Sequence, residues 1–113
     1  MAHYATFNDA RNHLKHMLDA ARLREQLAVL PGLRVEAVSE AGGWSMFVPG
    51  IPVAADGATF DEAADEMVLA LREYAEDWAE RLRLAPNHAG NWALVQLVGL
   101  SDDAELRAWV AGE

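Results

Sequence analysis

The most regular hydrophobic pattern in the chain runs from Thr59 to Leu82. Its apolar side chains recur every three or four residues, as on one face of an α-helix, and the opposite face is mostly acidic. The apolar positions are Phe60, Ala64, Met67, Leu71, Tyr74, Trp78 and Leu82. Thr59 can cap this segment, and Glu62, three residues later, can complete a capping box. The pattern predicts one long amphipathic helix.

Three short stretches upstream of this helix have the apolar patterns of β-strands. They are Arg34 to Ser39, Trp44 to Val48, and Val53 to Ala55. Glycines at 42 and 43, prolines at 49 and 52, and the Asp-Gly pair at 56 and 57 separate them and favour turns. We therefore predict a small antiparallel sheet packed by the long helix. Met67, Leu71 and Trp78 are expected to be buried against the strand that carries Trp44 and Met46.

A second helical pattern extends from Thr6, a candidate cap, to about Leu30, where a Pro-Gly pair ends it. Its first apolar stripe consists of Phe7, Ala10, Leu14, Met17, Leu18 and Ala21. Beyond Arg22 the stripe moves to Leu23, Leu27 and Leu30, so either the helix bends or two helices abut. Because the first stripe has no sheet of its own to cover it, we expect it to pack on a second copy of the chain, giving a homodimer.

The C-terminal part predicts two short helices. Trp92 to Leu100 is an apolar segment that favours a helix but is also compatible with a strand, with Trp92, Val95, Leu97 and Leu100 available for burial. The sequence Ser101-Asp102-Asp103 is a strong helix start. The last helix is expected to reach about Val110 and to bury Leu106, Trp109 and Val110. The predicted fold class is therefore α+β.

Composition narrows the classes of protein to which the chain can belong. The chain of 113 residues supports one domain and has no cysteine, which excludes disulfides and thiolate metal sites. No segment approaches the roughly 20 apolar residues that span a bilayer. The N-terminus lacks a signal-peptide core. We expect a cytoplasmic protein with no membrane partner.

The net charge of −9 is unevenly distributed. Residues 1–34 hold five basic and three acidic residues, a net charge of +2, whereas residues 35–113 hold four basic and fifteen acidic residues, a net charge of −11. A weakly basic head on a strongly acidic body suggests two surfaces with different partners. The simpler interpretation is an acidic surface that keeps a small protein soluble.

Candidate catalytic and metal-binding residues are few. His88 lies in a loop, where a histidine can be a ligand or a base but is more often structural or exposed. His13 and His16 have a spacing compatible with metal, but no third ligand lies nearby. The carboxylates at 61, 62, 65 and 66 sit where a helix dipole favours negative charge. We expect no enzymatic activity, no catalytic residue, no metal and no cofactor.

The stretch YATFNDARNHLKHMLDAAR resembles the opening helix of the Phd/YefM antitoxins, through Thr6, Ala10-Arg11, Leu14 and Leu18-Asp19. Such heads normally continue into a small sheet and a second helix, and they pair through that region into dimers that bind operator DNA. Here Ala21-Arg22 runs almost directly into LREQLAVLP, so the head is shortened. The resemblance implies Arg11 as a DNA contact, with Lys15 as a basic neighbour within helical reach.

Residues 34 to about 78 resemble the HicB-type antitoxin core, a degenerate ribonuclease-H-like β-β-β-α unit. The resemblance rests on Pro49-Gly50-Ile51-Pro52, Asp56-Gly57, Thr59 and Asp61-Glu62-Ala63. The order of a Phd-like head, a HicB-like body and a Trp-containing tail is also similar to an architecture of actinobacterial antitoxins. HicB-like cores are not nucleases, so the resemblance implies no catalytic residue.

These patterns lead to the hypothesis of a type II antitoxin. Residues 1–32 would form a helical segment for dimerisation and DNA binding, and residues 33–113 a HicB-like α+β domain with a helical tail. The expected partners are a cognate toxin, which we predict to be a basic ribonuclease, and operator DNA at the chain's own operon. The alternative is a non-catalytic structural or adaptor module whose paired apolar faces are its whole function. The adjacent open reading frame distinguishes the two hypotheses.

Overall fold

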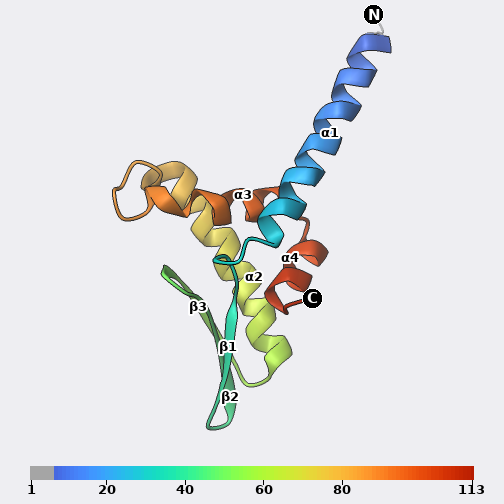
Figure 1. Ribbon diagram of the computed structural model, residues 1–113. Helices are drawn as coiled ribbons and strands as arrows, with labels where there is room; N and C mark the ends of the chain where they lie inside the picture. Colours follow the sequence, from blue (N-terminus) through green and yellow to red (C-terminus); the bar gives the residue numbers. More distant parts are fainter. Residues whose placement is uncertain (1–6) are drawn as a thin grey trace, which may run out of the picture.

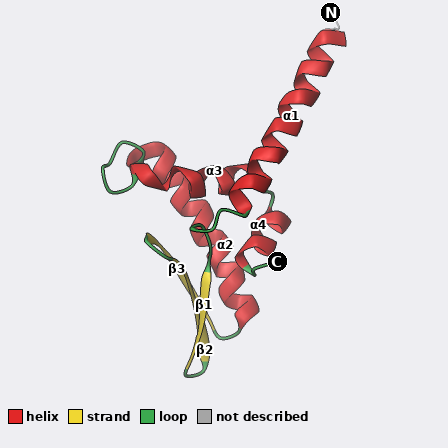
Figure 2. Cartoon of the chain, viewed as in Figure 1, coloured by secondary structure: helices red, strands yellow, loops and turns green. Residues whose placement is uncertain are grey.

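The computed structural model describes residues 7–113 (Figure 1), and side chains are described from Asp9 onward. The candidate cap Thr6 and the side chain of Phe7 lie outside the described residues. The elements are α1 (Phe7–Ala28), β1 (Glu36–Glu40), β2 (Gly43–Val48), β3 (Ile51–Gly57), α2 (Phe60–Asp77), α3 (Trp92–Leu100) and α4 (Asp103–Val110). The predicted α+β class is confirmed, with strands and helices segregated along the chain (Figure 2).

The sheet is an antiparallel meander in the order β1-β2-β3. Its hairpin turns carry glycines with a positive φ, Gly42 at +84° and Gly50 at +81°, and Pro49 precedes Gly50 as in a type II turn. The Asp-Gly pair at 56 and 57, predicted to favour a turn, instead ends β3 and pairs with β2. Pro52 lies on β3, an edge strand, where a missing backbone N–H is tolerated. The first strand begins two residues later than predicted, so Val35 precedes it.

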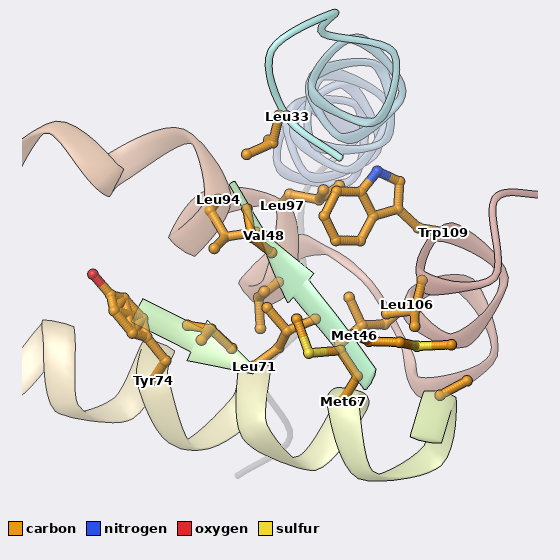
Figure 3. Packing of buried hydrophobic residues seen from close by; sticks show 14 of the residues in the cluster. Leu33, Met46, Val48, Met67, Leu71, Tyr74, Leu94, Leu97, Leu106 and Trp109 are labelled. Atoms are coloured by element: carbon orange, nitrogen blue, oxygen red, sulfur yellow. The ribbon is translucent and has the colours of Figure 1, made fainter. Parts of the chain in front are cut away.

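Helix α2 packs across one face of this sheet and buries the centre of the core (Figure 3). Thr59 caps it by accepting a hydrogen bond from the backbone N–H of Glu62 at 3.1 Å. The Glu62 carboxylate accepts from the N–H of Ala58 rather than from that of Thr59. Met46 of β2 and Met67 of α2 are fully buried. Trp44 closes the edge of the same interface. It is half-buried and packs edge-to-face on Phe60, with 5.3 Å between the ring centroids.

The two C-terminal helices complete the core. The segment Trp92–Leu100, ambiguous in sequence, is helix α3. Helix α4 begins at a full capping box, in which Asp102 accepts from the N–H of Glu105 and Glu105 accepts from the N–H of Asp102. Leu97 of α3 and Leu106 of α4 join the same buried cluster as Met46 and Met67. The N-terminal helix, the sheet, α2 and the tail are therefore joined by one core.

Arg72 of α2 ties the tail to the body. Its guanidinium donates to the carbonyls of Val98 at 2.6 Å and Ser101 at 2.9 Å, and to the Asp103 carboxylate at 2.9 Å. Carbonyls at the end of a helix have no partner within that helix, and a cation there also complements the helix dipole. Arg72 thus fixes the corner between α3 and α4.

Two tryptophans differ from the predicted burial. Trp78 is only half-buried, because α2 ends at Asp77 and the chain continues as a π-helical turn, Trp78–Leu82. Its indole N–H donates to the carbonyl of His88 at 2.9 Å, so the ring is directed to the α2–α3 loop. Trp92, expected to be available for burial, is 49% exposed at the start of α3. Leu94, which the sequence analysis did not name as a core residue, is buried instead.

Candidate functional site

Helix α1 is a single helix whose two halves have different surroundings. The C-terminal half packs on α3, with Leu27 buried. Arg24 donates to the Ser101 hydroxyl at 3.0 Å and lies 3.3 Å from a carboxylate oxygen of Glu105. The N-terminal half projects away from the body (Figure 1). The change of stripe near Arg22 therefore marks the point where the helix leaves the body, and neither a bend nor a second helix is present.

The projecting half carries an uncovered apolar stripe. Leu14, Met17 and Leu18 are 58%, 55% and 57% exposed. These side chains are spaced at three- and four-residue steps, so they lie on one face of the helix. The buried side chain of Leu27 belongs to another face, because it follows Leu14 by 13 residues and a helix turns by about 100° per residue. Exposed large apolar side chains gathered on one face make this stripe a candidate interaction site.

The two DNA-contact candidates lie on this same half of α1. Arg11 and Lys15 are both exposed and are four residues apart, so they share one side of the helix. His13 and His16 are also exposed there. Among the described residues, no group of three or more histidines, cysteines and carboxylates could hold a metal ion.

The outer face of α2 is acidic. Glu62, Asp65, Glu66, Glu73 and Glu76 are exposed at successive turns. Arg107 of α4 lies beside this face and donates to Asp65 at 2.8 Å and to Asp61 at 2.9 Å. The hydrogen bond with Asp65 raises the pKa of Arg107, burial lowers it, and the bond with Asp61 raises it again, with a net increase.

One apolar side chain interrupts this acidic face. Leu69 is 56% exposed in the middle of α2. Sequence reasoning missed Leu69 because it tracked the buried stripe. The available signal was a leucine whose neighbours three and four residues away are mostly carboxylates, namely Asp65, Glu66 and Glu73, with Arg72 as the exception.

His88 has a structural environment. The Asn91 amide donates to the Tyr74 hydroxyl oxygen at 2.7 Å, and this hydroxyl lies 3.0 Å from Nδ1 of His88. The hydroxyl can donate its proton to Nδ1 or accept a hydrogen bond from it, according to the tautomer of His88. With Trp78 bound to the His88 carbonyl, the histidine anchors the loop between α2 and α3 to the end of α2.

The serines show no nucleophilic arrangement. Ser45 bonds to the Asp56 carboxylate at 2.7 Å, and Ser101 donates to the Leu97 carbonyl at 2.7 Å. Neither hydroxyl is paired with a histidine in these bonds.

The fold is similar to that of one solved structure over nearly its whole length. A crystal structure from Syntrophomonas wolfei subsp. wolfei, described as the antitoxin part of a candidate toxin/antitoxin system, matches with a TM-score of 0.66. The match covers 91% of this chain and 92% of that chain at 18% sequence identity. No protein-family model and no curated protein sequence matches. None of the helices within residues 7–113 is both long and apolar enough to cross a bilayer.

Proposed function

We propose that this protein is the antitoxin of a type II toxin–antitoxin system and that it binds and neutralises a partner toxin. The observation that carries the proposal is the fold shared with an antitoxin along 91% of the chain. The resemblance of residues 34–78 to HicB-type cores supports the same class independently. The domain assignment follows: residues 33–113 bind the toxin, and residues 1–32 mediate assembly and DNA contact.

The charge distribution indicates the kind of toxin. Residues 35–113 carry a net charge of −11, and the outer face of α2 presents carboxylates at successive turns. A ribonuclease must hold RNA on a basic surface. Opposite charges on the two proteins speed their encounter and exclude wrong partners. The partner we propose is therefore a basic ribonuclease, and the complex forms in the cytoplasm, where the RNA is.

The adjacent open reading frame provides the test of this function. We expect its product to arrest growth when expressed alone and to be neutralised when this chain is co-expressed. The two proteins should also co-purify as a complex. An unrelated neighbouring gene, with no arrest and no complex, would instead support the structural or adaptor module, which the uncovered stripe of α1 also fits.

A homodimer is expected through the projecting half of α1. The protein should sediment as a dimer at concentrations on the order of tens of micromolar, the range where weak dimers form. The double variant Leu14→Glu with Met17→Glu should be a monomer, because dimerisation would bury two charges per chain in an apolar interface. Leu84→Glu, at a residue 85% exposed outside α1, is the matched control and should remain dimeric. A wild-type monomer at that concentration contradicts the proposal.

Operator DNA is the second proposed partner. A dimer that uses Arg11 and Lys15 of each chain would neutralise about four phosphates, giving a slope of log affinity against log salt near −4. Arg11→Ala should weaken this binding and reduce the slope to about −2, because two fewer counterions are released. The same substitution should leave toxin affinity unchanged.

The measurement is a parallel titration of the wild type and Arg11→Ala with toxin and with operator DNA. Arg83→Ala, an exposed basic residue on the acidic body, is the control for the loss of one positive charge. If toxin affinity collapses while DNA affinity holds, the two surfaces are assigned the wrong way round.

A further inference from the structure

The outer face of α2 combines charge with one exposed apolar anchor. Its side chains follow a single line along the helix axis, because they recur every three or four residues. The members of this line are Glu62, Asp65, Glu66, Leu69, Glu73 and Glu76, all exposed. We name this line the Leu69 ridge. From the first to the last residue it covers about 21 Å at 1.5 Å per residue.

Leu69 stands between two hollows in the surface. The first lies between α2 and α4, has a volume of about 440 Å³, and has Val68, Leu69 and Ala104 as its apolar wall. The second lies between α2 and β3, has a volume of about 210 Å³, and shares Leu69. A side chain that packs on Leu69 from either side would therefore gain more contact than one resting on a flat surface.

The hollow between α2 and α4 is held in shape by the ion pairs around it. Arg107 bridges Asp61 and Asp65, and Arg72 bonds to Asp103 at the other end. These two arginines are thus engaged within the fold. By contrast, Glu66, Glu73 and Glu76 form no ion pair with any described residue. The ridge therefore presents carboxylates that remain available to an incoming basic group.

Charge distinguishes this surface from the stripe on α1. The exposed apolar residues of α1 lie on the same half of the helix as Arg11 and Lys15, whereas Leu69 is bordered by carboxylates. A partner with a basic surface is attracted by the carboxylates around Leu69, whereas residues 9–19 of α1 hold two basic and two acidic side chains and offer no such attraction. An apolar centre within a charged border is also the arrangement of protein interfaces, in which a few central side chains provide most of the affinity.

We propose that the Leu69 ridge is the toxin-docking surface, and that its occupant is a basic surface of the toxin about 20 Å long with an apolar side chain near its middle. This inference rests on the proposed antitoxin function and assigns its binding site. Leu69 provides the central contact, and Glu66, Glu73 and Glu76 provide the border that accelerates encounter. Docking there covers the toxin's basic surface, from which RNA is then excluded.

The test measures association and dissociation rates of the full-length protein with the purified product of the adjacent reading frame. Leu69→Ala should raise the dissociation rate about tenfold with little change in association, since a central contact acts on dissociation. The double variant Glu73→Gln with Glu76→Gln should slow association and flatten its dependence on salt. The controls are Val29→Ala, an apolar residue 77% exposed elsewhere, and Glu36→Gln with Glu40→Gln on β1.

Each outcome decides the inference. Effects confined to the ridge variants support it. Binding by the wild type with unchanged rates for both ridge variants overturns the site while leaving the antitoxin function intact. Absence of both binding and neutralisation by the wild type overturns the function and the inference together. If sedimentation shows that Leu69→Ala abolishes self-association, the ridge is occupied by a second copy of this chain, and the toxin assignment is wrong.

Discussion

Replacing Leu71 with alanine is expected to lower the free energy of unfolding by about 2–5 kcal/mol. Leu71 lies in the middle of α2, is 1% exposed, and belongs to the cluster in which α2, the sheet and the C-terminal helices meet. Truncation loses the free energy gained by transferring the leucine side chain from water to the core. It also leaves a cavity that α2, the sheet and the C-terminal helices cannot fully close. Because small domains have about 5–15 kcal/mol of stability in total, this one change should be readily measurable.

Urea denaturation followed by tryptophan fluorescence measures this change. Leu69→Ala is the matched control, because the same substitution is made two residues earlier on the same helix at a side chain that is 56% exposed. Its cost should stay near or below about 0.5 kcal/mol, as for other surface substitutions. A loss below about half a kcal/mol for Leu71→Ala would mean that this side of α2 faces solvent.

The elements that the sequence predicted best are those specified by local chemistry. The cap at Thr59, the turn at Gly42 and the start of α4 at Asp102 each depend on residues within a few positions of the backbone that they fix. The α+β class followed from two periodicities, one of about two residues and one of about 3.6. Such signals lie wholly within short windows of the chain.

The features that the sequence did not predict depend on contacts between distant segments. Trp78 and Trp92 fit apolar stripes, but the π-helical turn directs Trp78 to the His88 carbonyl, and Trp92 starts α3 at the surface. A stripe identifies a face and does not say which element covers it. For the same reason the sequence predicted that the first stripe of α1 lacks a sheet to cover it, but not that the second half of the helix packs on α3.

The candidate surfaces were predictable in part. The uneven charge, which suggested two surfaces, and the uncovered stripe of α1, which suggested a homodimer, are both visible in the sequence. Leu69 was overlooked because an exposed leucine is common and gains meaning only from its position. Its position between two hollows, beside the ion pairs of Arg72 and Arg107, depends on contacts between distant segments and is visible only in the structure.

Gly57→Ala should destabilise the fold by about 3 kcal/mol or more, because β3 approaches the start of α2 closely at this residue. This cost lies at or beyond the upper end of ordinary overpacking costs. A Cβ on Gly57 would overlap the backbone nitrogen of Ala63 and lie 2.8 Å from the carbonyl carbon of Glu62. Both atoms belong to the backbone of the first turn of α2, so no side chain can rotate away. The Ala63 N–H is bonded to the Thr59 carbonyl at 3.0 Å. Relieving the contact therefore means opening the turn that starts the helix.

Gly99→Ala is the matched control, since a Cβ at Gly99 in α3 would meet nothing within 4 Å. That variant should gain about 0.5–1 kcal/mol, because alanine restricts the unfolded chain and favours the helix. Both variants are compared with the parent by urea denaturation, together with the yield of folded protein. Opposite shifts of the two midpoints are expected from the same chemical change. If the Gly57→Ala midpoint equals that of the parent, β3 and the first turn of α2 are further apart than the structure places them, and the position of α2 on the sheet must be revised.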